Sequence, residues 1–208
     1  MRRIERLAQG EGIIYVAGRL FDIDEKLKSE ALEEAVLDGT RKAATTLALP
    51  IAQLPTFVPF RDAGQEELIV EDKTRRLFEL DLARLRRTVL LVSYIDGLAK
   101  DEGVCFEIGY VYAIGGAILL ISTDFCEIEL PSGHTTPLDP LLHAAATRLI
   151  RRPRLVSTDA TFRDSLLSSR AQVLADVQTA TAELLIEPDA RQARLNARRS
   201  IRCVTRCS

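Results

Sequence analysis

Hydrophobic residues along the chain gather in short runs that alternate with longer charged stretches. Runs rich in β-branched and aliphatic residues predict buried strands at residues 13–17, 56–59, 89–95 and 117–122. Between them, apolar residues recur at helical spacing and predict helices over residues 24–37, 66–87 and 104–114, with Asp38-Gly39 ending the first. Beyond Leu141 the pattern predicts a helix, a short strand at 154–157 and a long helix over 160–185.

Strands that alternate with helices predict an α/β fold with a mostly parallel sheet covered by helices on both faces. We expect residues 1–150 to form the catalytic domain. We expect residues 151–208 to form a C-terminal helical extension that packs on that domain or extends it. Ligands of such sheets bind beyond the carboxyl ends of the strands. The expected site therefore lies at the loops that follow Ala17, Val58, Ile95 and Ser122.

Composition narrows the class of protein. Hydrophobic residues make up 47% of the 208 residues, and the net charge of -2 argues against a nucleic-acid binder. The amino-terminal segment lacks the apolar run of a signal peptide, and no stretch is long enough to span a membrane. We therefore expect a cytoplasmic protein with reduced thiols. No CxxC motif occurs among the four cysteines and only two histidines are present, so we expect no metal site and no cofactor.

Two carboxylates fall on stripes that are otherwise apolar. On the predicted helix 104–114, Glu107 shares a face with Val104 and Val111. On the preceding helix, Asp81 lies four residues from both Leu77 and Leu85. Burying a carboxylate costs free energy unless the group is paired or used in chemistry. Each acid by itself could instead be a structural acid paired with an arginine or capping a helix.

A third acid, Asp101, precedes Glu107 by six residues, a spacing that would separate the two side chains on one continuous helix. With Asp101 in a loop and Gly103 as the turn, both side chains can point into one cleft. Paired carboxylates suit glycosidic chemistry, because one attacks the anomeric carbon while the other handles a proton. The apolar neighbours and the helix dipole would leave Glu107 ionised but poorly hydrated, as a nucleophile requires.

In addition to these acids, several segments together resemble the nucleoside 2-deoxyribosyltransferase family. The order of the segments along the chain also resembles that of the family, over roughly residues 12–145. They are Ile14-Tyr15-Val16-Ala17-Gly18-Arg19-Leu20-Phe21, Phe57-Val58-Pro59-Phe60-Arg61-Asp62, Asp81-Leu82, Asp96-Gly97, Asp101-Glu102-Gly103 and Phe106-Glu107-Ile108-Gly109-Tyr110.

The resemblance implies a flavodoxin-like, doubly wound fold and the transfer of 2-deoxyribose between nucleobases through a covalent glycosyl-enzyme ester. It implies that Glu107 is the nucleophile and that Asp101 orients it or helps to bind the sugar. Asp81 would protonate the leaving base and accept the proton of the incoming one. The implied partners are deoxyribonucleosides and free nucleobases, as in purine and pyrimidine salvage.

The same resemblance supplies the expected substrate contacts. Phe21 would face the base, and Arg61 and Asp62 lie where contacts to the base are expected. The remaining contacts are expected in the site loops, at Gly18, Asp22 and Gly103. Family members also take a sugar contact from a neighbouring subunit; the matching residue here is Asp139, which implies a homo-oligomer with shared active sites.

Other functions remain open. Arg19 stands where the family has proline, which leaves base specificity undecided, and an N-glycoside hydrolase of nucleosides or nucleotides would use the same acids with water as acceptor. A non-catalytic nucleotide-binding module would bind without turnover but would not explain three acids in one cleft. A Rossmann dehydrogenase is disfavoured because Gly18 does not begin a GxGxxG motif. Cys105 is more simply a small helix residue than a catalytic thiol.

Overall fold

The computed structural model describes residues 1–19, 22–50, 55–62, 73–97, 100–129, 133, 135–153 and 161–189. A five-stranded sheet has the order β2-β1-β3-β4-β7, and every neighbouring pair is parallel. This order is that of flavodoxin-like doubly wound proteins, which confirms the expected fold class. The strands are β1 (Ile13–Ala17), β2 (Thr56–Phe57), β3 (Thr88–Tyr94), β4 (Ala117–Ser122) and β7 (Arg148–Arg151).

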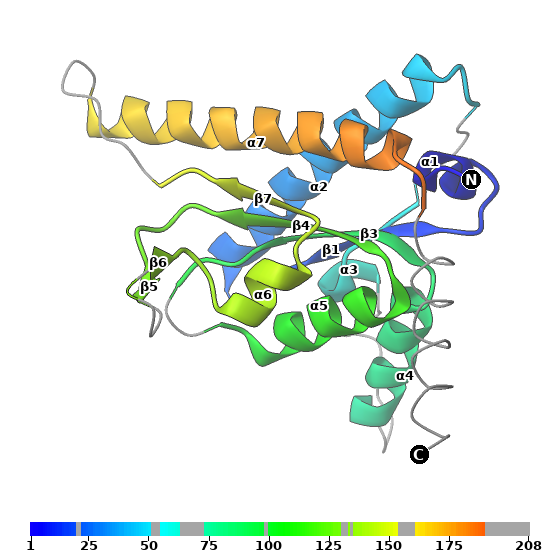
Figure 1. Ribbon diagram of the computed structural model, residues 1–208, viewed down its shortest axis with the longest axis horizontal. Helices are drawn as coiled ribbons and strands as arrows, with labels where there is room; N and C mark the ends of the chain where they lie inside the picture. The colour runs from blue at the N-terminus through cyan, green and yellow to red at the C-terminus, as the bar shows by residue number, and fades with distance from the viewer. Residues whose placement is uncertain are drawn as a thin grey trace.

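Helices cover both faces of this sheet (Figure 1). One face carries α1 (Arg3–Ala8) and the long pair α2 (Ile23–Thr46) and α7 (Phe162–Ile186). The other carries α4 (Lys73–Leu85) and α5 (Glu102–Ile114), with α6 (Pro140–Ala145) packed on α5. The short helix α3 (Pro59–Asp62) follows β2, and a small hairpin of β5 (Ile128–Glu129) and β6 (Thr135–Thr136) follows β4.

The sheet separates two hydrophobic clusters, because successive strand residues point to opposite faces. Along β1, Ile14 and Val16 join the cluster under α2 and α7. Tyr15 and Ala17 join the cluster under α4 and α5, together with Ile108. A tyrosine is thus buried among aliphatic side chains on the face that also carries α5.

Helix α2 does not end at Asp38-Gly39 as the sequence predicts, but continues to Thr46. Gly39 is buried where α2 crosses α7, and a Cβ atom there would lie 2.8 Å from Cβ of Thr181 and would also clash with the backbone of Gln178. The glycine therefore serves close packing of two helices instead of helix termination.

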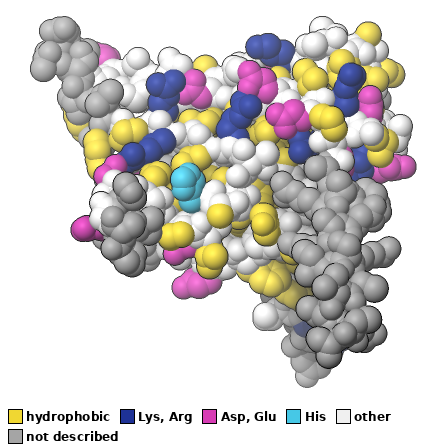
Figure 2. Space-filling view, viewed as in Figure 1, with side chains coloured by type: hydrophobic (Ala, Val, Ile, Leu, Met, Phe, Trp, Pro, Cys, Tyr) yellow, Lys and Arg dark blue, Asp and Glu magenta, His cyan; other side chains and the backbone are white. Residues whose placement is uncertain are grey.

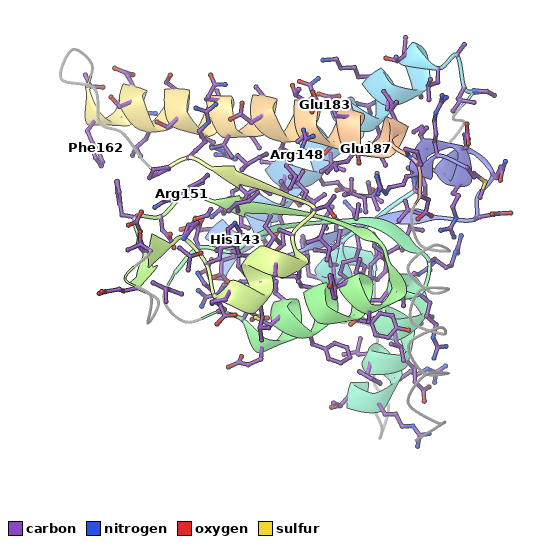
Figure 3. The ribbon with its side chains drawn as sticks, viewed as in Figure 1. His143, Arg148, Arg151, Phe162, Glu183 and Glu187 are labelled. Atoms are coloured by element: carbon purple, nitrogen blue, oxygen red, sulfur yellow. The ribbon has the colours of Figure 1, made fainter. Side chains whose placement is uncertain are left out.

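The carboxyl-terminal helix α7 contacts both the sheet and the amino-terminal helix α1. The predicted strand at 154–157 lies outside the described residues. The strand that follows α6 and pairs with the outer side of β4 is Arg148–Arg151. Figure 3 labels Arg148 on this strand and Glu183 on α7, which form an ion pair. Near the end of α7, the Arg3 guanidinium donates to the carbonyl of Leu184 at 2.6 Å. Among the described residues, no helix is long and apolar enough to cross a membrane.

Candidate active site

Three elements bring the candidate catalytic groups together on the α4–α5 face. Strand β1 presents Tyr15, which is fully buried. Helix α5 presents Glu107 from its second turn, on the stripe of buried Val104 and Val111. Helix α4 presents Asp81, which is half-buried between Leu77 and Leu85 along the helix. The negative charge of Asp81 acts on both Tyr15 and Glu107, so the three side chains form one electrostatic cluster.

The Tyr15 hydroxyl donates a hydrogen bond to Oε1 of Glu107 at 2.6 Å, a length typical of a bond to a carboxylate. The Tyr15 ring packs against Phe57, with centroids 5.3 Å apart, and the Phe57 ring lies 5.4 Å from the guanidinium carbon of Arg84. The tyrosine is held by this packing, so its hydroxyl orients one oxygen of Glu107 and leaves the other free to react.

Burial raises the pKa of Glu107 to about 8, and the negative charges of Asp81 and Asp101 act in the same direction. The hydrogen bond from Tyr15 opposes this shift because it stabilises the ionised carboxylate. Glu107 is thus a mostly buried carboxylate whose charge is poorly solvated, and it titrates close to neutral pH.

Asp81 differs from an ordinary structural acid. Burial raises its pKa to about 6. Its Oδ1 is buried and has no hydrogen-bond partner among the described residues. An aspartate in this setting can hold a proton near neutral pH and can offer it to a bound molecule.

Asp101 is the last residue of the loop that precedes α5. Its Oδ1 accepts a hydrogen bond from the backbone N–H of Val104 at 2.9 Å, which makes it the N-cap of the helix. The turn expected at Gly103 is wrong, since Gly103 lies in the first turn of α5. A Cβ at Gly103 would lie 3.1 Å from Oδ1 of Asp101, so the glycine leaves room for the cap.

The loop after β1 carries the expected contacts Gly18 and Asp22, whereas Phe21 lies outside the described residues. A Cβ at Gly18 would lie 2.9 Å from Oγ of Ser29, so the loop passes close to α2. Asp22 accepts a hydrogen bond from the backbone N–H of Glu25 at 2.8 Å and caps α2. Arg19 forms an ion pair with Glu25 at 3.2 Å.

Arg61 and Asp62 belong to a paired network at the end of β2. Two guanidinium nitrogens of Arg61 donate to Glu33 at 2.6 and 2.9 Å, and its Nε donates to Asp62 at 2.7 Å. Glu33 also accepts from the Thr56 hydroxyl at 2.5 Å. Asp62 accepts from the backbone N–H of Val58 at 2.8 Å. Both expected base contacts therefore have protein partners in this structure.

Asp139 is placed away from Glu107. It caps α6 by accepting from the backbone N–H of Leu141 at 2.8 Å, and it is exposed. Together with Cys105 and Gly109 it lines a groove between α5 and α6, and its charge acts on the Cys105 thiol. Within one chain, Asp139 and Glu107 thus lie on different sides of α5.

Tyr15 is a functional residue that sequence-based reasoning misses. The available signal was a single hydroxyl in the strand Ile13–Ala17, because a buried tyrosine hydroxyl needs a hydrogen-bond partner. The partner could not be identified, since Glu107 lies 92 residues further along the chain. In the described part of the chain, no three His, Cys, Asp or Glu side chains are grouped as metal ligands.

A comparison with protein families shows the class of this protein. The sequence profile of the family described as nucleoside 2-deoxyribosyltransferase matches residues 14–136, more than half of the chain. The chain belongs to this family. The resemblance inferred from the motifs is confirmed, and the protein is a glycosyl-transferring enzyme.

Solved structures similar to this member of the family include a 2-deoxyribosyltransferase from Bacillus psychrosaccharolyticus, with 16% identity and a TM-score of 0.45 over 74% of this chain and 96% of that one. A 2-deoxyribosyltransferase from Leishmania mexicana has 18% identity and a TM-score of 0.40, and the match covers 76% of this chain and 95% of that one. A CMP N-glycosidase from Clostridium botulinum has 14% identity and a TM-score of 0.38, and the match covers 76% of this chain and 98% of that one. No curated protein sequence matches the chain significantly.

Proposed function

We propose that this enzyme transfers 2-deoxyribose between nucleobases by a retaining double displacement, with Glu107 as nucleophile. The observation that carries the proposal is the buried cluster in which Glu107 accepts a hydrogen bond from Tyr15 while Asp81 lies close enough for its charge to act on both. Family membership supplies the class of reaction, and the cluster supplies the groups that the reaction needs.

In the first step, a carboxylate oxygen of Glu107 attacks C1′ of the deoxyribonucleoside from the side opposite the base. The C1′–N bond breaks, and its electron pair stays on the base, which takes a proton from Asp81. The products are a glycosyl ester on Glu107, a free base and an ionised Asp81.

In the second step, a ring nitrogen of another base attacks C1′ from the vacated side. The ester bond breaks, its electrons return to the Glu107 carboxylate, and the proton of the incoming nitrogen passes to Asp81. Two inversions at C1′ restore the original configuration. The cycle needs no cofactor, because it begins and ends with one proton on Asp81 and an ionised Glu107.

The two acids share a proton near neutral pH, and the reaction needs one particular distribution of that proton. Burial raises both pKa values, to about 6 for Asp81 and about 8 for Glu107, so near neutral pH the two acids hold about one proton between them. The order of these values places the shared proton mainly on Glu107, even though the hydrogen bond from Tyr15 lowers the pKa of Glu107. The reactive form, with Glu107 ionised and Asp81 protonated, is therefore the minor form of the free enzyme. The apolar side chains around Glu107 limit water, which would otherwise hydrolyse the ester.

We place the substrate at the loops that carry Gly18, Phe21, Asp22 and Gly103, with the base toward Arg61 and Asp62. The sugar lies beside Asp101, and deoxyribonucleosides are preferred over ribonucleosides. In this proposal, a base that enters displaces part of the pairing between Arg61 and Glu33. Comparable rates on adenosine and deoxyadenosine would overturn the sugar preference.

We further propose that residues 1–150 form the catalytic domain and that residues 151–208 extend it. We also propose that the enzyme works in the cytoplasm, in nucleoside salvage, as a homo-oligomer.

The proposed oligomer has a candidate interface. Figure 2 shows hydrophobic side chains gathered over α5 and α6, where Leu141 is 81% exposed and Tyr112 is 41% exposed. A second copy that covers this surface would also bury Asp139 at the interface. Light scattering tests this: we expect an oligomer that L141D dissociates, and a fully active wild-type monomer would overturn it.

The reaction itself is tested by incubating the enzyme with deoxyadenosine, with and without free cytosine, and separating the products. The proposal predicts deoxycytidine and adenine when cytosine is present, and little adenine without it. Free adenine at the same rate in both incubations would instead assign the chain as an N-glycoside hydrolase, in which water attacks the ester. Binding without any product would indicate a non-catalytic module.

A further inference from the structure

A cavity lies on the opposite face of the sheet from Glu107. Its volume is about 380 Å³, within the range of about 300–1,000 Å³ typical of small-molecule sites. It is formed by the amino-terminal parts of α2 and α7 and by the ends of β3 and β4. Tyr94, the last residue of β3, packs against the α2–α7 cluster, whereas Tyr15 belongs to the α4–α5 cluster. The sheet therefore separates this cavity from the candidate active site.

Three cationic side chains line this cavity: Lys28 from α2, Arg152 from the segment after β7, and Arg170 from α7. Asp24 is the one acid among the described residues that line it. Lys28 Nζ lies 3.9 Å from the centroid of the Tyr94 ring, and the Arg170 charge also acts on Tyr94. Lys28 and Arg170 therefore both act on the end of β3, and the described lining holds three cations and one acid.

Much of this positive charge remains available to a ligand. The ion pair between Arg152 and Asp176 uses Nε of the arginine, at 2.6 Å, and no described residue binds its two terminal nitrogens. No carboxylate of the described ranges pairs with Arg170. Lys28 contacts Asp96 at 2.7 Å but is 42% exposed, so its ammonium can donate to a further acceptor.

The rest of the lining is apolar or hydroxylic. Leu27, Leu166 and Val173 supply aliphatic surface, and Ser169 and Thr123 supply hydroxyl groups. Figure 3 labels Phe162 at the amino-terminal end of α7, the end of the helix from which Leu166, Ser169 and Arg170 line the cavity. A ligand that satisfies this lining carries an anionic group for the three cations and an apolar or flat body for the aliphatic wall.

We propose that this cavity binds a small organic phosphate of the nucleoside monophosphate class. Arg152, Arg170 and Lys28 hold the phosphate, because guanidinium groups bind phosphate oxygens in pairs and an ammonium adds a point charge. The base lies against Leu27, Leu166 and Val173, and Asp24 accepts hydrogen bonds from ribose hydroxyls or an amino group. The cavity adjoins the Gly18 loop, since Lys28 and Tyr94 also line a smaller pocket there, but none of its described lining residues is Glu107, Asp81 or Tyr15.

Isothermal titration of the full-length protein with adenosine 5′-monophosphate tests the site. We expect R170Q to weaken binding about ten- to a hundredfold, the loss typical of a charge-assisted hydrogen bond. The matched control R75Q makes the same charge change on α4, across the sheet, and is expected to bind like the wild type. Turnover of deoxyadenosine by R170Q is expected to be normal.

Two further titrations make the result decisive. The variant E107A is expected to bind the nucleotide with unchanged affinity, and inorganic phosphate and adenosine, tested separately, are each expected to bind more weakly than the nucleotide. Equal affinity in R170Q and wild type, loss of binding in E107A, or no binding at millimolar concentration would each overturn the proposal. Phosphate that binds as tightly as the nucleotide would overturn the assigned class of ligand.

Discussion

Two groups of acids in this molecule have opposite electrostatic properties. At the end of β2, burial alone would raise the pKa of Glu33, but hydrogen bonds from Arg61 and Thr56 lower it below its usual value. The pKa of Asp62 is lowered in the same way, by hydrogen bonds from Arg61 and from the backbone N–H of Val58. On the α4–α5 face, burial raises the pKa of Asp81 and of Glu107.

The difference lies in the partners and not in burial alone. Arg61 neutralises Glu33. Within the described part of the chain, Glu107 instead receives only the Tyr15 hydroxyl, and Oδ1 of Asp81 has no partner. An acid that is paired with a cation stabilises the fold but cannot easily change its protonation state. An acid without a cation costs stability, yet it can attack carbon or exchange a proton. The comparison thus separates structural acids from candidate catalytic ones.

The largest expected effect is that of E107A. Without a nucleophile, kcat for deoxyribose transfer should fall by at least about 10⁴-fold, as for removal of other enzymatic nucleophiles. Circular dichroism should show that the variant is folded. The control E102Q changes an exposed acid of the same helix and should retain normal turnover. Near-normal turnover in folded E107A would remove the distinction between the two groups of acids.

The second effect is that of D81N, for which we expect a loss of about 10²–10⁴-fold, typical of removal of a general acid. The loss should be much smaller for a 7-methylated purine deoxynucleoside, since a base that is already cationic leaves without a proton. The pH profile should also change. The rate of the wild type should follow a bell-shaped pH profile with limbs at about pH 6 and 8. The rate of D81N should only rise with pH, as Glu107 ionises. An alkaline fall in D81N would contradict the role of Asp81.

A smaller effect, about 10- to 100-fold on kcat, is expected for Y15F, which removes a hydrogen bond to the ionised Glu107. Without this bond the pKa of Glu107 rises further, so the alkaline limb of the profile should move to higher pH while the maximum falls. A lower rate with an unshifted profile would instead indicate that Tyr15 acts only through packing against Phe57.

The smallest expected effect on turnover is that of E33Q, which should mainly reduce stability, by about 1–3 kcal/mol at neutral pH. Because folding lowers the pKa of Glu33, its contribution is present at neutral pH and is lost as the pH falls, so the difference in Tm from wild type should shrink toward acidic pH.

The stability of E107Q should depend on pH in the opposite way. Folding raises the pKa of Glu107 from 4.5 to about 8, so the wild type loses stability as the pH rises and E107Q should gain relative to it. Parallel Tm profiles would contradict the comparison.

Much of the fold could be predicted from the sequence because three strands, β1, β3 and β4, are mainly aliphatic runs buried on both faces. Strand β7, with Arg148 and Arg151 at its ends, lies at the edge of the sheet, where arginines are solvated and the apolar run is only two residues long. The end predicted at Gly39 failed because local propensity cannot reveal that α7 crosses α2 there.

Part of the site could be predicted for a similar local reason. Asp81 and Glu107 interrupt apolar stripes on their own helices, a conflict that is visible without any knowledge of contacts. The roles of Tyr15 and Glu33 depend on partners that are 92 and 28 residues away, so only the folded chain reveals them. Long-range pairing also distinguishes a neutralised acid such as Glu33 from an unpaired one such as Asp81.

The most direct test of the central claim is to find the residue that carries the sugar. A deoxyribonucleoside with fluorine at C2′ reacts slowly, because fluorine destabilises the oxocarbenium-like transition state, and the glycosyl ester should accumulate. After an acid quench and proteolysis, mass spectrometry should show the fluorinated sugar on the peptide that contains Glu107, and prior addition of free cytosine should discharge it as a nucleoside with the original configuration. An adduct on another residue, or a product inverted at C1′, would contradict Glu107 as the nucleophile of a double displacement.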